Sequence, residues 1–121
     1  MAEYVDGFVI PVPKKQIDEY KKHARKFAKV WIEHGALSVR ECFADDVPYG
    51  KVTSFPRSVE RKNSETVVFS WITFKSRAHR DKVNKLVMAD PRLEGMDPDT
   101  VPFDLKRMIY GGFTVGVSVD S

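Results

Sequence analysis

The segment from Thr66 to Phe74 (TVVFSWITF) constrains the fold more than any other part of the chain. It is rich in β-branched and aromatic residues, which predicts a strand. Successive side chains of a strand point to opposite faces, and both faces here are apolar. One face carries Val67, Phe69 and Trp71, and the other carries Val68, Ile72 and Phe74. We therefore expect a strand at the centre of a sheet, with cover on both sides.

Five further elements are expected around this strand. Apolar residues that recur at steps of three and four predict an amphipathic helix, which opens at Pro13 and stops at Gly35. Ser76 is the expected N-cap of a second helix over 77–89. Strands are expected over Tyr4–Val12, Leu37–Ala44 and Arg107–Val119. The stripe of the first helix consists of Ile17, Tyr20, Ala24, Phe27, Ala28 and Trp31, and the last strand rests on the alternation of Val115, Val117 and Val119.

The predicted element order is β-α-β-β-α-β. With right-handed crossovers, this order gives a ferredoxin-like α+β fold, an antiparallel sheet with two helices on one face. The helices cover one apolar set of the third strand, so the other set would form an exposed patch of the kind that marks an interface. Two sheets packed face to face about a two-fold axis would bury both patches. We therefore predict a homodimer through the sheet face.

Two connections are less regular. The stretch from Asp45 to Glu65 is long, and we expect short strand segments in it at Val52–Phe55 and Ser58–Arg61. The stretch from Gly95 to Asp104 is rich in turn residues. Neither contains a repeat or a low-complexity tract, so the chain is expected to be one domain over residues 1–121.

Charge and cysteine content exclude several classes of protein. The formal net charge is +3 over 121 residues, and the basic residues are interleaved with acids, a pattern that favours a solvated surface over a nucleic-acid-binding face. Cys42 is the single cysteine, which excludes an intrachain disulfide, and it is interpreted as a buried thiol. The first residues lack a basic signal-peptide region and no long apolar run follows, so we expect a cytoplasmic protein without a membrane span.

Short motifs spread over nearly the whole chain indicate a family. They are YVDGFV at 4–9 followed by Pro11-Val12-Pro13, Trp31 before Gly35-Ala36-Leu37, DDV at 45–47, TSF at 53–55, FSW at 69–71, SRAHRD at 76–81 and KRMIYGGF at 106–113. Together they resemble the YbaA-like family of uncharacterised bacterial proteins (domain of unknown function 1428). The resemblance implies a dimeric α/β-barrel assembly. It implies no established activity, so no catalytic residue is carried over.

Two acids are the leading candidates for a ligand site. Strand alternation places Asp6 on the side of Phe8, and it places Glu41 on the side of Val39. A carboxylate on an apolar face loses hydration, which raises its pKa and suits it to acid–base chemistry. The two acids can bracket a pocket near Trp71. The alternative is that each acid pairs with an arginine, such as Arg40 or Arg107, or lies in water at a strand end.

Two other motifs add candidates. His79 and Arg80 lie in the first turns of the second helix, where free N–H groups and arginine can hold an anion, or where they simply cap the helix and pair with Asp81. Arg107 and Tyr110 precede Gly111-Gly112, a pair that favours a β-bulge or a close backbone approach to a ligand. The three histidines are scattered, so no metal site and no cofactor are expected.

Three functions remain open from these residues. The first is a small-molecule pocket protein, either a binder or a cofactor-independent enzyme that resembles the dimeric barrel monooxygenases. The second is a structural or stress-related dimer without catalysis. The third is weak binding of RNA or another polyanion by the basic face of the first helix.

Overall fold

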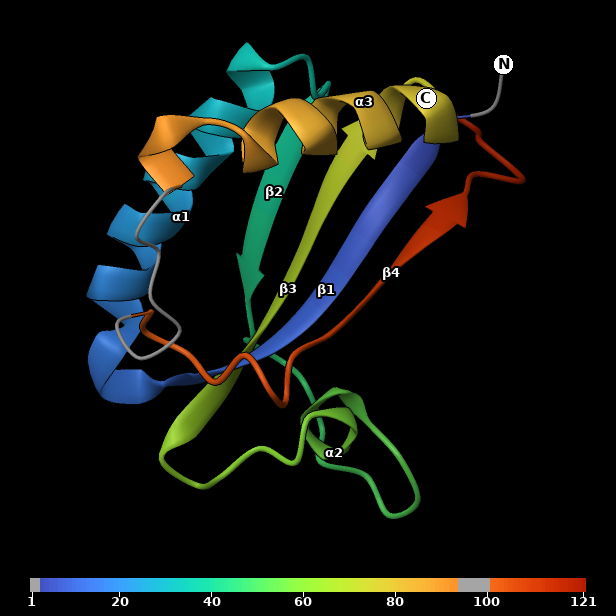
Figure 1. The fold of residues 1–121 in the computed structure, drawn as a ribbon. Coiled ribbons are helices and arrows are strands. Elements are labelled where there is room, and N and C mark those ends of the chain that lie inside the picture. Colours follow the sequence, from blue (N-terminus) through green and yellow to red (C-terminus); the bar gives the residue numbers. More distant parts are fainter. Residues whose placement is uncertain (1–2, 94–100) are drawn as a thin grey trace.

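The computed structural model describes residues 3–93 and 101–121 (Figure 1). Short 3-10 turns lie at Lys14–Gln16 and at Pro91–Leu93. The order agrees with the predicted β-α-β-β-α-β sequence, with the short helix α2 added. The elements are β1 (Tyr4–Pro13), α1 (Ile17–Glu33), β2 (Ser38–Phe43), α2 (Phe55–Ser58), β3 (Glu65–Phe74), α3 (Arg77–Met88) and β4 (Ile109–Thr114).

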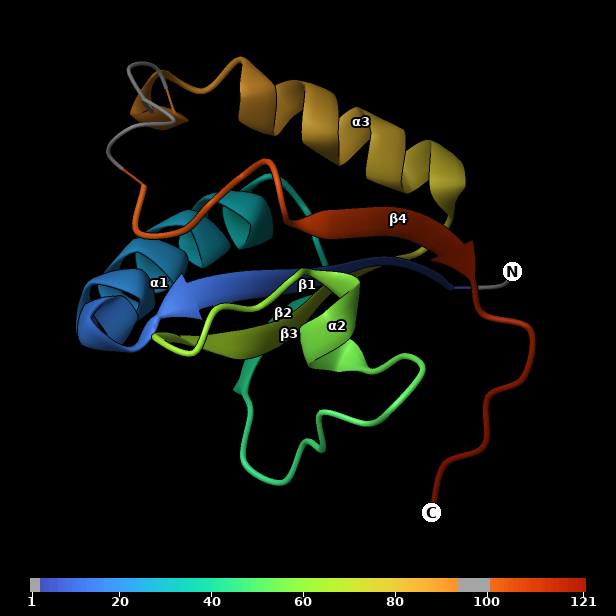
Figure 2. The same cartoon turned by 90° about the horizontal axis from the view of Figure 1, so that it is seen from below.

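The four strands form one antiparallel sheet in the order β2-β3-β1-β4. The strand at Glu65–Phe74 is central, as its two apolar faces predicted. Helices α1 and α3 lie against one face of the sheet, and α2 lies on the other side (Figure 2). This is the ferredoxin-like α+β arrangement expected from the element order.

The face under α1 and α3, which we call the inner face, carries the main core. Tyr4, Ile72 and Phe74 pack there with Val83 and Val87 of α3. A second buried cluster lies further along the sheet and includes Ile10, Val12, Tyr20 and Val68. The inner face therefore buries one of the two apolar sets of β3.

The opposite face, which we call the outer face, is only partly covered. Val9 and Val67 are buried there with Val59, which follows α2. Phe69 and Phe113 stay exposed, at 43% and 64% of their surface. The outer face therefore keeps the apolar patch expected from the second set of β3.

Two predicted helix boundaries are confirmed, the start of α3 at Ser76 and the end of α1 before Gly35. The hydroxyl of Ser76 accepts a hydrogen bond from the His79 N–H at 3.1 Å, which caps α3. After α1, Gly35 adopts a φ of 116°, and the N–H of Ala36 donates to the Trp31 carbonyl at 3.0 Å. Because only glycine adopts this backbone freely, Gly35 turns the chain from α1 toward β2.

Three local predictions were wrong. Short strands were expected at Val52–Phe55 and Ser58–Arg61, but this stretch contains α2, because Ser54 caps the N–H of Arg57 and Pro56 suits a first helical turn. The last strand ends at Thr114 rather than Val119. Its partner β1 begins at Tyr4, which pairs with Thr114, so the later valines have no strand to join.

The prediction for Cys42 was also wrong, and the prediction for 95–104 can be compared with the structure only in part. Cys42 is exposed rather than buried, because alternation along β2 turns it to the outer face. The turn-rich stretch expected over 95–104 falls largely outside the described residues, and 101–104 is irregular.

Candidate functional site

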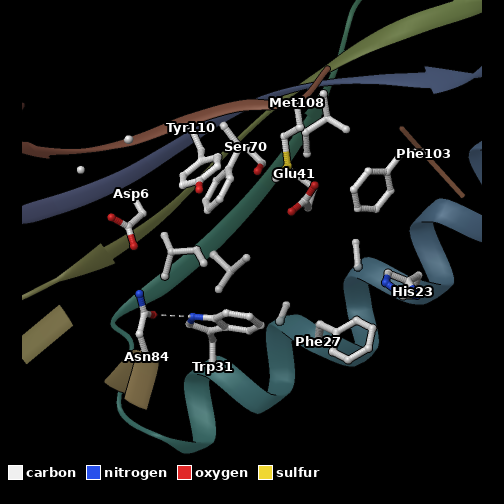
Figure 3. A pocket seen from close by; sticks show the side chains of 18 of the residues that line it. Asp6, His23, Phe27, Trp31, Glu41, Ser70, Asn84, Phe103, Met108 and Tyr110 are labelled. Carbon is white, nitrogen blue, oxygen red and sulfur yellow. Dashed lines mark hydrogen bonds between the residues drawn. The ribbon is translucent and has the colours of Figure 1, made fainter. Parts of the chain in front are cut away.

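A cavity of about 410 Å³ lies between the inner face of the sheet and helix α1 (Figure 3). It lies between the two core clusters, because Ile72 of the first and Ile10 and Tyr20 of the second line it. Trp31 and Phe27 of α1 face the strands across the space. Most of the wall is apolar, and its polar groups fall into two small sets. The residues that line it from β1 and α1 are Asp6, Phe8, Ile10, Tyr20, His23, Ala24, Phe27, Ala28 and Trp31.

The first polar set is centred on Glu41 of β2. The Tyr20 hydroxyl of α1 donates a hydrogen bond of 2.5 Å to Glu41 Oε1. Burial raises the pKa of the Glu41 carboxyl, although the hydroxyls of Tyr20 and Ser70 act in the opposite direction. Burial, followed by the nearby Glu41 charge, raises the pKa of Tyr20 far above its ordinary value, so Tyr20 stays a neutral donor.

The second polar set is an ion pair that joins β1 to α3. Arg80 Nη1 lies 2.5 Å from Asp6 Oδ1, and Arg80 Nε lies 2.8 Å from Asp81 Oδ1. The guanidinium also lies over the ring of Tyr4, at 4.9 Å from its centre. Asp6 is only 7% exposed, so this pairing compensates a carboxylate that would otherwise be buried alone.

The strand register places the two acids on the same face, but they are offset along it. Glu41 pairs with Ser70 on β3, and Ser70 pairs with Phe8 on β1, two residues from Asp6. Two strand spacings and two residues place their Cα atoms roughly 12 Å apart. The acids therefore mark two separate parts of one cavity, rather than a close carboxylate pair.

In the Gly111-Gly112 pair, Gly112 is the position where the structure leaves no space for a side chain. The β1–β4 register is continuous from Tyr4↔Thr114 to Val9↔Ile109, so the expected bulge is absent from this ladder. A Cβ on Gly112 would meet Tyr4 Oη at 2.3 Å and Arg80 Nη1 at 2.9 Å. The close approach is therefore made by the side chains that hold the Asp6–Arg80 pair.

We predict that Gly112→Ala destabilises the protein by about 1–3 kcal/mol, because the new methyl group displaces packed side chains. Urea unfolding followed by circular dichroism measures this loss. Gly116→Ala is the matched control, because a Cβ there meets nothing within 4 Å. Equal stability of the two variants would show that Gly112 has no packing role.

The seven candidate residues do not all meet in this cavity. Asp6, Glu41, Arg80 and Tyr110 line it, and Tyr110 stacks on Phe8 with ring centres 6.2 Å apart. Trp71 pairs with Gly7, so it lies on the outer face and not beside the acids.

His79 and Arg107 also lie elsewhere. The Nδ1 atom of His79 accepts a hydrogen bond from the Lys75 N–H at 3.0 Å, and its ring packs against Phe74. Arg107 binds Glu65 through two hydrogen bonds, of 2.8 and 2.6 Å. Neither Asp6 nor Glu41 pairs with Arg40 or Arg107; the arginine beside Asp6 is Arg80.

Several lining residues were not among the candidates. Trp31, which belongs to the apolar stripe predicted for the first helix, lines the cavity, and its indole N–H donates to Asn84 Oδ1 at 3.2 Å. Burial, and then the charge of Lys26, lower the pKa of His23. The helix stripe of Tyr20, Ala24, Phe27, Ala28 and Trp31 was the available signal, because two alanines between large aromatics leave space above them.

Comparison with known proteins places the chain in a family. Residues 3–105 match the family described as a protein of unknown function, DUF1428. The chain belongs to the DUF1428 family. This result confirms the resemblance drawn from the motifs. The uncharacterized protein YbaA of Escherichia coli K12 is 50% identical over 111 residues, which cover 92% of this DUF1428 chain and 94% of that protein.

Solved structures support the fold of this DUF1428 protein. A dimeric ferredoxin-like protein from an uncultured marine organism superposes with a TM-score of 0.64 at 12% identity, covering 98% of this chain and 100% of its own. An uncharacterized NIPSNAP domain protein from Burkholderia xenovorans gives a TM-score of 0.62 at 16% identity, covering 98% and 99%. At these identities the likeness shows the fold alone.

Among residues 3–93 and 101–121, no three histidine, cysteine, aspartate or glutamate side chains gather into a group able to hold a metal ion. In the same ranges, no helix is both long and apolar enough to span a membrane.

Proposed function

We propose that this DUF1428 protein binds a small molecule with an apolar body in the cavity between α1 and the sheet, and that it acts as a homodimer. The observation that carries the first part is the cavity itself. Its volume of about 410 Å³ falls in the range of roughly 300–1,000 Å³ typical of ligand pockets. Protein cores normally leave few voids larger than a water molecule, so a space of this size favours a binding protein over a purely structural dimer.

The wall chemistry supports the same proposal. Aromatic and aliphatic side chains supply most of the surface, and Glu41 and the Asp6–Arg80 pair supply a few polar groups. Ligand pockets commonly combine a mainly apolar wall with a small number of placed polar groups that fix orientation. A ligand would therefore gain affinity from the aromatics and orientation from Glu41.

A cavity-filling variant tests this proposal. We expect 2-phenylethanol, a neutral probe, to shift the backbone NMR signals of cavity residues in the wild-type protein. Ala28→Trp fills the space from α1 and is expected to weaken this binding at least tenfold, a change of about 1.4 kcal/mol. Ala78→Trp is the matched control, because Ala78 is exposed on α3. Absence of shifts in the wild type, or shifts that survive Ala28→Trp, would contradict the proposal.

The outer face supports the dimer. Phe69 contacts Phe55 and Trp71 there, with ring centres 5.6 and 5.3 Å apart, and Ile109 and Phe113 extend the apolar surface onto β4. An apolar patch of this kind on a sheet face favours burial against a second copy. A structural neighbour is itself described as a dimeric ferredoxin-like protein, and the same assembly is proposed for this chain.

A cytoplasmic location is also part of the proposal. Cys42 is a free and exposed thiol on the outer face, and such thiols persist in reducing compartments. Cell fractionation that recovered the protein outside the cytoplasm would contradict this assignment.

A further inference from the structure

The charged groups that line the cavity limit the kind of ligand it accepts. Arg80 is paired with Asp6, so these two charges offset each other. Burial, and then the charge of Lys26, lower the pKa of His23, which disfavours a positive charge on its ring. Among the described lining residues, Glu41 therefore remains as a carboxyl group without a cationic partner.

The carboxyl group of Glu41 is held by neutral hydroxyl groups. The Tyr20 hydroxyl occupies Oε1, and Tyr20 is a neutral group that brings no positive charge. The Ser70 hydroxyl also lies beside the carboxyl group and lowers its pKa, and Ser70 is a neutral group as well. Figure 3 shows the carboxyl group of Glu41 directed into the cavity. A cation placed there would compensate the carboxylate that burial disfavours.

The walls suit the rest of a cationic ligand. Phe27 and Trp31 of α1 line the space together with Phe103, which precedes β4 and lies beside Glu41 (Figure 3). Aromatic faces attract ammonium groups through their quadrupoles, and they also bury an apolar body. The same walls would also accept a neutral molecule, so the charge of Glu41 is what would make the cavity prefer a cationic ligand to a neutral one.

Arg80 is the lining residue that would favour an anionic ligand instead, because a guanidinium group can bind a carboxylate. Its Nη1 and Nε atoms are held by Asp6 and Asp81, so the three side chains together carry a net negative charge. The Arg80 side chain is only 18% exposed. An anion in the cavity would approach an arginine that is already paired. The carboxylates of Asp6, Asp81 and Glu41 would repel it.

We propose that the ligand is an organic cation, an amine on an apolar body about the size of one aromatic ring, with its ammonium group bound by Glu41 Oε2. This inference rests on the proposed cavity function and adds the class of ligand. The ammonium would donate to Oε2 while Tyr20 holds Oε1, so Glu41 would be bound on both oxygens.

A charge series separates this inference from the cavity proposal. Isothermal titration calorimetry at pH 7 compares 2-phenylethylamine, 2-phenylethanol and 3-phenylpropionate, which share a phenyl body and differ in charge. We expect the amine to bind roughly tenfold or more tighter than the alcohol, the order expected of one charge-assisted hydrogen bond. We expect the acid to bind more weakly than both.

Glu41→Gln tests the residue, because glutamine keeps the shape and the contact with Tyr20 but removes the charge. We expect amine affinity to fall to within about twofold of alcohol affinity in this variant, since the charge is the difference. Glu19→Gln is the control, because Glu19 is an exposed acid of α1 outside the cavity. It should leave both affinities unchanged.

The outcomes distinguish the two proposals. If the acid binds as tightly as the amine, or the amine no tighter than the alcohol, the cation inference is wrong and the cavity proposal stands. If none of the three probes binds at millimolar concentration, both are wrong.

Discussion

Trp71→Glu is expected to convert the proposed dimer into monomers. Trp71 lies on the outer face of the central strand β3, where Phe69 contacts it and Gly7 faces it on β1. In the dimer, the new carboxylate would be buried against an apolar partner surface without a cation. Because central aromatic residues of an interface commonly contribute 2 kcal/mol or more, we expect the dissociation constant to rise roughly a hundredfold.

Sedimentation velocity over a concentration series measures this change. Leu86→Glu is the control, because Leu86 is an exposed apolar residue on α3, away from the outer face. We expect this control to remain dimeric like the wild type. A wild-type protein that is monomeric at micromolar concentration, or a Trp71→Glu protein that dimerises normally, would overturn the proposed assembly.

Arg107→Met is expected to reduce the free energy of unfolding by about 3–5 kcal/mol, the usual cost of leaving a buried ion without its partner. Arg107 binds both carboxylate oxygens of Glu65 and donates to the Glu60 carbonyl at 2.9 Å, and its Nε donates to Asp104. The Glu65 side chain is only 5% exposed, so water cannot replace the lost contacts. Guanidinium unfolding of the variant measures the loss.

The pH dependence identifies Glu65 as the cause. Hydrogen bonds from Arg107 lower the pKa of Glu65 from its ordinary value of 4.5, so the pair stabilises the fold above that pH. This contribution is lost as the pH falls through the folded-state pKa, so the gap between variant and wild type should narrow below pH 4.5. Arg77→Met, at an exposed position of α3, should change stability by less than about 0.5 kcal/mol. A gap that did not depend on pH would exclude Glu65 as its source.

The sequence predicted the fold well because its signals are local and consistent. Alternation along 66–74, the Ser76 cap and the glycine at 35 each specify one element, and their order leaves few topologies. The failures arose where a pattern lacked a partner or a competing signal was stronger. Val117 and Val119 alternate but have no neighbouring strand, and the Ser54–Pro56 helix start prevailed over strand propensity.

The candidate site was predicted only in part, for a geometric reason. Alternation places Asp6 and Glu41 relative to their own strands, but the register between strands decides which residues of β3 share their face. The register placed Ser70 and Ile72 with the acids, and it placed Trp71 on the other face. Likewise, adjacent residues of a helix point about 100° apart, so α3 directs Arg80 to Asp6 while His79 packs on Phe74.

A crystal structure of the protein soaked with 2-phenylethylamine would show directly where the amine binds and which way its nitrogen points. We predict density for the phenyl ring between α1 and the sheet, with the nitrogen within hydrogen-bond distance of Glu41 Oε2. A cavity without density at saturating concentration, or a probe with its nitrogen directed away from Glu41, would contradict it.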